Sequence, residues 1–163
     1  MDVEVRAARR EDAAGLAELL NGVIARGGTT ALEEPFTPER LDATYLTGPE
    51  VICCVVAVDP ASGRHEGFQT LGRYPGLPDG YGDIGTFARV GGTQRGVGRA
   101  LFAATQAEAR RLGLAGINAT IRADNTGGLQ FYSRLGFVDH SVRQALPLKD
   151  GTVVDRISKR YAL

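Results

Sequence analysis

Apolar residues recur at two spacings along the chain, and these spacings divide it into predicted helices and strands. Residues 2–8 alternate in polarity as a half-buried strand does, whereas residues 11–26 place leucines and an isoleucine three and four positions apart, as one helical face does. Further helices are predicted after Thr37, where Pro38 suits a first helical position, over residues 99–113, and from Asn125 to Leu135. The other apolar or alternating runs predict strands over 51–59, 65–73, 83–90, 115–123, 137–148 and 152–163.

The resulting order of elements is β-α-α-β-β-β-α-β-α-β-β. It predicts an α/β (α+β mixed) fold, in which a mixed central sheet carries helices on both faces. With 163 residues the chain has the usual size of one domain, and we expect a single domain over residues 1–163. Hydrophobic residues make up 43% and charged residues 23% of the chain, a composition typical of folded globular proteins.

The balance of charges and the length of the apolar runs limit the classes of partner that the protein is expected to bind. The 19 basic and 19 acidic residues balance, so no basic surface is expected for nucleic acid or for an anionic membrane. No apolar run approaches the roughly 20 residues that span a bilayer, and residues 1–12 lack the core of a signal peptide. We therefore expect a cytoplasmic protein. Its two histidines lie apart from any cluster of cysteine or carboxylate at ligand spacing, and no metal site is predicted.

The two cysteines, Cys53 and Cys54, are neighbours in the predicted strand 51–59. Successive side chains of a strand point to opposite faces, so the two thiols are not expected to pair with each other. We interpret them as small buried thiols in a reducing compartment rather than as a disulfide, a metal site or a nucleophile.

The most informative segment is a glycine-containing turn, Arg95-Gly96-Val97-Gly98-Arg99, between a strand and the long helix that follows. The first N–H groups of a helix lack intrahelical partners, and the helix dipole adds partial positive charge, so such a turn can hold a phosphate. The two arginines could add charge-assisted contacts. Glycines also form tight turns before helices without binding any ligand, and this alternative remains open. A dinucleotide fingerprint is disfavoured, because Leu101 stands where its third small residue belongs.

A second motif lies downstream, in the run NTGGLQFYSRLGF that begins at Asn125. Together with RGVGRAL, it resembles the two acetyl-coenzyme A (acetyl-CoA) motifs of the GCN5-related N-acetyltransferase (GNAT) family, and the resemblance extends over essentially the whole chain. Thr93 departs from that family's glutamine or arginine. Within the family, residues 34–38 look similar to the loop before the second helix in phosphinothricin acetyltransferases.

The resemblance implies acetyl-CoA as cofactor and assigns residues to it. The turn would hold the pyrophosphate, and the main chain of the preceding strand would pair with the pantetheine arm. Asn125 resembles a cofactor-contacting asparagine, although its position suits a helix N-cap equally well. The implied cofactor-binding residues are Phe87, Ala88, Val90, Arg95, Gly96, Val97, Gly98, Arg99, Ala100 and Asn125.

Two further residues are candidate catalysts. Transfer of an acyl group to an amine expels a thiolate, and a phenol near the sulfur can donate a proton to it. The resemblance implies this role for Tyr132; the alternative is packing or cofactor positioning only. The acceptor must also lose a proton, because an alkyl ammonium has a pKa of about 10.4. Asp83 is the candidate base, where the family group has a glutamate, and the alternative is that Asp83 caps the turn before its strand.

Three functions fit these residues. The first is an enzyme that acetylates a small primary amine by direct transfer within a ternary complex; the family also favours a homodimer. The second is an acyl-CoA sensor module without turnover, and the third is a protein or peptide N-acetyltransferase. The resemblance to the family implies an acceptor pocket formed by residues 29–36, residues 74–82 and Gln69. Sequence alone does not name the acceptor.

Overall fold

The structure is a computed structural model that describes residues 3–163, so Asp2, placed in the first predicted strand, lies outside the described residues. The predicted order of elements is confirmed. The elements are β1 (Glu4–Ala7), η1 (Arg10–Asp12), α1 (Ala13–Arg26), α2 (Pro38–Leu41), η2 (Asp42–Leu46), β2 (Val51–Val58), β3 (His65–Gly72), β4 (Tyr81–Ala88), α3 (Val97–Arg111), β5 (Gly116–Arg122), α4 (Thr126–Leu135), β6 (Val138–Pro147) and β7 (Val153–Ala162).

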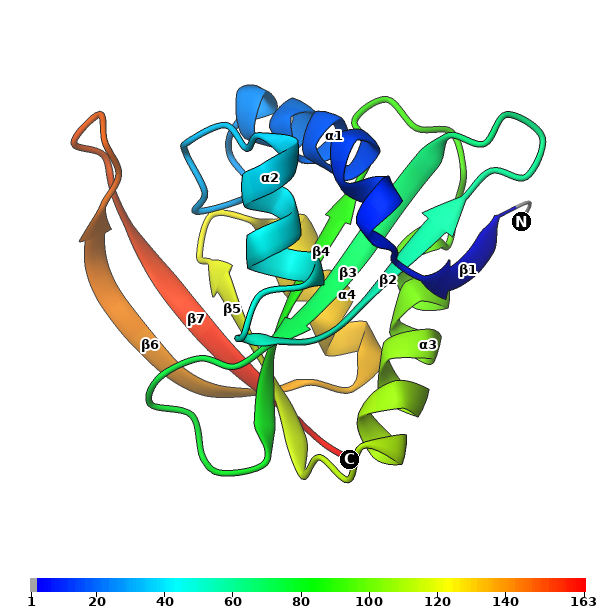
Figure 1. Cartoon of the computed structure of the whole chain (residues 1–163). Helices are drawn as coiled ribbons and strands as arrows, with labels where there is room; N and C mark the ends of the chain where they lie inside the picture. The colour runs from blue at the N-terminus through cyan, green and yellow to red at the C-terminus, as the bar shows by residue number, and fades with distance from the viewer. Residues whose placement is uncertain (1–2) are drawn as a thin grey trace.

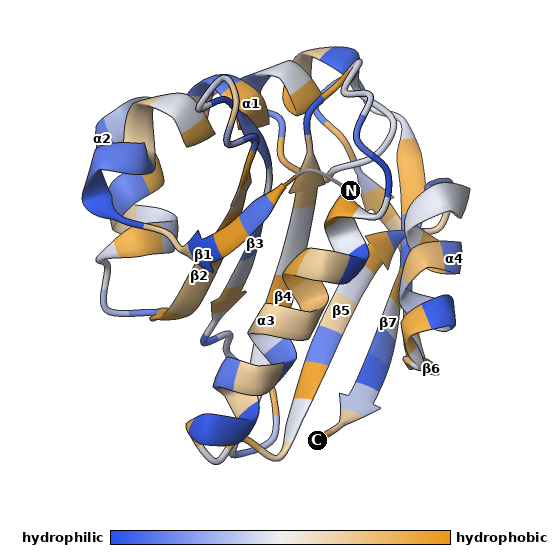
Figure 2. Ribbon diagram, turned by 90° about the vertical axis from the view of Figure 1, so that its right-hand side faces the viewer, coloured by the Kyte–Doolittle hydropathy of each residue, from blue (hydrophilic) through white to orange (hydrophobic). Residues whose placement is uncertain are grey.

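A seven-stranded mixed sheet forms the centre of the molecule, in the order β1-β2-β3-β4-β5-β7-β6 (Figure 1). Helices α1 and α2 cover one face of this sheet, and α3 and α4 cover the other. Alternation along β2 shows why both faces are apolar: Cys54 and Val56 pack under α1, whereas Val55 and Ala57 pack under α3. In Figure 2, hydrophobic and hydrophilic bands alternate along β1 and β5, β7 is mostly hydrophilic, and the C-terminal end of α3 is hydrophilic.

The two cysteines occupy opposite faces, as expected. Cys54 belongs to the core under α1, and Cys53 packs against the core on the other face of the sheet. Both thiols are free, and burial raises the pKa of Cys53 to about 11. Each thiol therefore stays protonated and unreactive at neutral pH.

Several boundaries differ from the prediction by a few residues. Strand β4 begins at Tyr81 and not at Asp83, because the turn ends at Gly80, which has a positive φ of 80°. The ring of Tyr81 lies where a side chain at Gly116 of β5 would stand, so the missing side chain lets the two strands start together. Helix α3 begins at Val97, two residues before the predicted start. The helix after Thr37 widens into one π-helical turn, η2.

The parallel pair β4 and β5 separates halfway along its length. Residues 81–84 of β4 pair with residues 116–119 of β5, but within the described chain residues 85–88 and 120–122 form no pairs across this boundary. Figure 1 shows the two strand ends diverging. This opening in the middle of the sheet positions the site described below.

No helix of the described part combines the length and the apolar character needed to cross a bilayer.

Candidate functional site

A cleft of about 870 Å³ lies at the opening between β4 and β5. Its walls come from both faces of the sheet, and from the loops at residues 29–32 and 74–77. Most residues expected from the sequence line it, namely Asp83, Phe87, Ala88, Gly96, Gly98, Arg99, Asn125 and Tyr132. The lining does not include Val90, Arg95, Val97 or Ala100. Val97 has a buried side chain packed under β2, so only its main chain can serve a ligand.

One end of the cleft is the start of α3. Gly96 precedes this helix in the left-handed conformation, with φ 73° and ψ 13°, a region that favours glycine. The N–H groups of the first helical turn have no intrahelical acceptor, and Arg99 is exposed beside them. The free main-chain donors, the positive end of the helix dipole and Arg99 thus lie at the same end of the cleft, an arrangement that suits a phosphate.

Gly98 has a packing role that the sequence did not indicate. A Cβ atom at this position would lie 2.7 Å from Cε1 of Phe131 on α4. A side chain here would therefore press on the contact between α3 and α4, whether or not a ligand is bound.

The middle of the cleft is bordered by the free edge of β4. On its other side this strand pairs with β3 along its length, from Asp83 opposite Gly72 to Ala88 opposite Gly67. Residues 85–88 therefore present main-chain N–H and C=O groups to the opening, where no strand takes them. Such groups require a partner, and an extended ligand can supply one in the way an added strand does.

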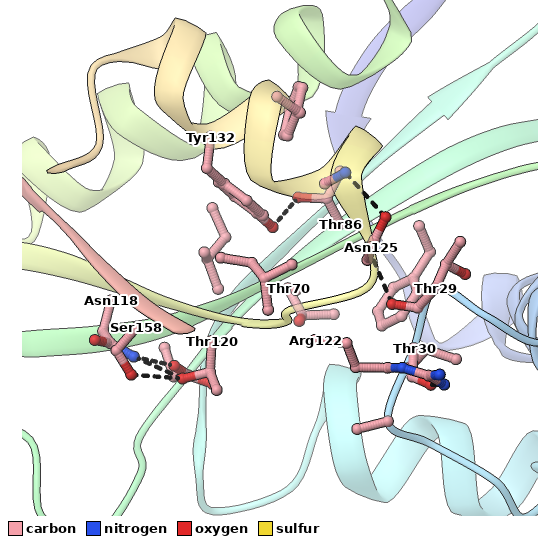
Figure 3. Close-up of a pocket in the computed structure, with 18 of the residues that line it drawn as sticks. Thr29, Thr30, Thr70, Thr86, Asn118, Thr120, Arg122, Asn125, Tyr132 and Ser158 are labelled. Carbon is pink, nitrogen blue, oxygen red and sulfur yellow. Dashed lines mark hydrogen bonds between the residues drawn. The ribbon is translucent and has the colours of Figure 1, made fainter. Parts of the chain in front are cut away.

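Tyr132 reaches the cleft from α4. Its ring packs against Phe131 and Phe137, and its hydroxyl lies 2.8 Å from the hydroxyl of Thr86 on β4 (Figure 3). Burial raises the pKa of Tyr132, although the hydrogen bond with Thr86 opposes the shift. The phenol is therefore protonated at neutral pH and can act as a donor.

Gln69 does not line the cleft, contrary to the expectation. It is fully buried behind Thr86, and its Nε2 donates to the Thr86 hydroxyl over 2.9 Å. The register explains this position, because Gln69 and Thr86 are direct partners on β3 and β4. The side chain supports the residue that holds Tyr132.

Asp83 faces the cleft from the opposite side of the sheet. It is the third residue of β4, so it neither begins the strand nor caps the preceding turn. Its Oδ1 accepts a hydrogen bond of 2.9 Å from Nδ2 of Asn118, and Oδ1 of Asn118 accepts one from Arg160. Burial raises the pKa of Asp83 more than the Asn118 hydrogen bond lowers it. This carboxylate is therefore a stronger base than an exposed one.

Asn125 caps α4, as predicted, and also fastens a loop. Its Oδ1 accepts from the Gly128 N–H over 3.0 Å, and its Nδ2 donates to the Thr29 carbonyl over 3.0 Å. The second contact joins α4 to the loop between α1 and α2 at the mouth of the cleft (Figure 3).

Of the loops expected to form the acceptor pocket, residues 29–32 line the cleft, whereas residues 33–36 and 78–82 do not.

The two contacts of Asn125 can be separated by mutation. Asn125→Ala removes both and is expected to lower the free energy of unfolding by about 1 kcal/mol, as loss of an N-cap does. Asn125→Asp keeps the capping oxygen but loses the donor to Thr29, so it should retain most of that stability. Urea denaturation of both variants checks this. Equal losses in the two variants would show that the loop contact, and not the cap, carries the stability.

Five arginines of the cleft wall were not predicted from the sequence: Arg122, Arg134, Arg143, Arg156 and Arg160. Two of these arginines have a signal in the sequence: residues 156, 158 and 160 alternate, so Arg156 and Arg160 lie on one face of the predicted last strand. The register that sets them beside Arg122 and Arg143 could not be read from that alternation.

Comparisons with known proteins identify the fold of this chain. The sequence matches no protein-family model, and a search among curated proteins finds no match. Solved structures do match. An N-acetyltransferase from Staphylococcus aureus Mu50 superposes with a TM-score of 0.86 at 18% identity, over 99% of both chains. A GCN5-related N-acetyltransferase from Kribbella flavida gives 0.82 at 23% identity, over 99% of this chain and 98% of the other.

A third structure was solved with a ligand. It is a GNAT superfamily phosphinothricin acetyltransferase from Sinorhizobium meliloti in complex with AcCoA, and it matches with a TM-score of 0.86 at 19% identity, over 100% of this chain and 89% of the other. These similarities extend over the whole sheet and its helices. The chain therefore has the fold of the GCN5-related N-acetyltransferases.

Proposed function

We propose that this protein is an acetyl-CoA-dependent N-acetyltransferase that acts on a small primary amine. The observation that carries the proposal is the opening between β4 and β5, where a free strand edge runs up to the start of α3. A proton donor and a base flank the same opening from opposite faces of the sheet. Structures of the same fold include enzymes named as N-acetyltransferases, which supports the proposal.

The chain's own features fit acetyl-CoA. The turn at Gly96 and the N-terminus of α3 suit the pyrophosphate, with Arg99 as a counter-charge. The free edge of residues 85–88 suits the amide-containing pantetheine arm, as expected for Phe87 and Ala88. Acetyl-CoA would supply the acetyl group as an activated thioester.

Two side chains divide the proton transfers. Asp83 takes a proton from the ammonium of the acceptor, directly or through one water, and its raised pKa favours this step. Tyr132 keeps its proton at neutral pH and donates it, or a hydrogen bond, from Oη to the departing sulfur. Because the two groups approach from opposite faces, amine and thioester meet in the opening.

Direct transfer in a ternary complex fits better than a covalent acetyl-enzyme. Cys53 and Cys54 lie in the core, and burial raises the pKa of both thiols. Neither side chain lines the cleft. A cysteine nucleophile would need to be an exposed thiolate, which these positions disfavour.

The experiment that tests the function measures release of CoA thiol from acetyl-CoA in the presence of a panel of primary amines. Amine-dependent release together with a mass increase of one acetyl group on the amine is expected. Tight CoA binding without turnover on any amine would instead favour a sensor module.

The phosphate site has its own test in Arg99→Gln. Loss of a charge-assisted contact costs about 1.5–3 kcal/mol, so CoA affinity measured by calorimetry should fall by about 10- to 100-fold. Affinity for pantetheine, which lacks the pyrophosphate, should stay within about twofold of wild type. Arg110→Gln, at the exposed far end of the same helix, is the control and should leave both affinities unchanged. An equal fall in the affinities for CoA and pantetheine would show that the pyrophosphate does not bind at the start of α3.

A further inference from the structure

Three arginines stand in one row across the C-terminal part of the sheet. Arg122 of β5 is the direct partner of Arg156 on β7, and Arg156 is the direct partner of Arg143 on β6. Residues directly opposite each other project from the same face of a sheet, and all three line the cleft. Like charges placed directly opposite one another destabilise a sheet, so an anion bound between these arginines would stabilise it.

The protein itself neutralises only one end of the row. Arg122 forms a two-point ion pair with Asp124, at 2.9 and 2.7 Å, and donates to the Thr30 carbonyl. Within residues 3–163, the guanidinium groups of Arg143 and Arg156 form no ion pair or hydrogen bond, and Nε of Arg156 is buried without a partner. Asp83 is the one carboxylate among the cleft-lining residues of the described chain.

The row lies on the acceptor side of the cleft. On β5, Ile117, Ala119 and Ile121 pack into the core under α3 and α4, so Arg122 projects from the opposite face. Asn118, which binds Asp83, projects from this same face. The start of α3, proposed for the cofactor phosphates, lies on the other face. An anion held by the row therefore belongs to the acceptor.

We propose that Arg156 and Arg143 bind an oxyanion of the acceptor, a carboxylate or a phosphonate, and that this group is remote from the reacting amine. The row is four residues along the strand from the level of Asp83 and Asn118, and Arg156 is two strands across from Asp83. These offsets correspond to about 13 Å along the strands and roughly 10 Å across them. An acceptor that reaches both Asp83 and Arg156 separates its amine from its acid by several bonds. The assignment rests on the proposed function.

Calorimetric measurement of the binding of small acids and amines in the presence of saturating CoA tests this proposal without requiring turnover. The probes are 4-aminobutyrate, 3-aminopropylphosphonate, the neutral 4-aminobutyramide, and glycine, whose acid adjoins its amine. We expect both remote acids to bind at least about tenfold more tightly than 4-aminobutyramide and than glycine, as a charge-assisted contact implies. Whichever of the two acids binds more tightly shows whether the site prefers a carboxylate or a phosphonate.

Arg156→Gln should reduce the preference for the remote acids to about twofold or less, and CoA affinity should be unchanged. Arg143→Gln, at an exposed position, repeats the test where folding is not at risk, and Arg110→Gln is the control that should keep the full preference. The proposal is overturned by equal binding of acid and amide, by a preference that survives both substitutions, or by no binding of any probe at millimolar concentration. Failure of the amine panel with preserved acid binding would overturn the proposed function alone.

Discussion

Tyr132→Phe should lower the rate of acetyl transfer by about 100-fold or more under conditions where chemistry limits the rate, since one general acid typically contributes that much. The substitution keeps the ring between Phe131 and Phe137 and removes only the hydroxyl that meets Thr86. The affinity for CoA should be unchanged. Single-turnover kinetics and calorimetry on the same preparation measure the two quantities.

The matched control is Tyr161→Phe. The hydroxyl of Tyr161 also makes one side-chain hydrogen bond, accepting from Nε2 of Gln106 over 2.6 Å, but this residue lies outside the cleft. It should lose about as much stability as Tyr132→Phe and keep its turnover. If both variants turn over at the wild-type rate, Tyr132 has a packing role only.

Asp83→Asn should lower turnover at neutral pH by about 100-fold, and the loss should shrink as pH rises toward the pKa of the free amine, about 10.4. The wild-type rate should fall with decreasing pH as the carboxylate becomes protonated. This fall in rate begins at a higher pH than it would for an exposed aspartate, because burial raises the pKa of Asp83. The rate of Asp83→Asn should not show this fall. Rate profiles on one amine, measured for both proteins across the same pH range, supply the comparison.

The thermal stability of Asp83→Asn distinguishes a catalytic role of Asp83 from a structural one. Because burial raises the pKa of Asp83 in the folded state, the ionised carboxylate opposes folding once the pH exceeds that pKa. Asp83→Asn removes this charge and can still accept from Asn118, so its thermal midpoint at neutral pH should not fall below that of wild type. Asp79→Asn, on the exposed loop outside the cleft, is the control. Parallel rate profiles for Asp83→Asn and wild type would exclude Asp83 as the base.

The fold was predictable because local signals agree with the packing. Thr37 and Asn125 accept hydrogen bonds from the third residue after them, as caps do, and Gly136 ends α4 with a φ of 107°. Boundaries were less accurate where glycine obscured the alternation, as at the start of β4. The separation of β4 and β5 has no local signal, because it depends on which residues pair across the sheet.

The site was predictable only where one segment carries it. The Gly96 turn and Tyr132 follow from contiguous motifs, and both line the cleft or its end. Gln69 was placed in the acceptor pocket on the family resemblance, and this was wrong because its orientation is set by its pairing with Thr86 on the neighbouring strand. The arginine row combines three strands, so it becomes visible only once β5, β7 and β6 are in register.

Hydrogen exchange with and without acetyl-CoA tests the central claim most directly, because it follows the main-chain groups at the opening. Acetyl-CoA should slow exchange at residues 85–88 on the free edge of β4 and at residues 97–99 at the start of α3. Exchange on β1, at the far edge of the sheet, should stay unchanged. Unaltered exchange at residues 85–88 and 97–99 with saturating acetyl-CoA would contradict binding in the opening between β4 and β5.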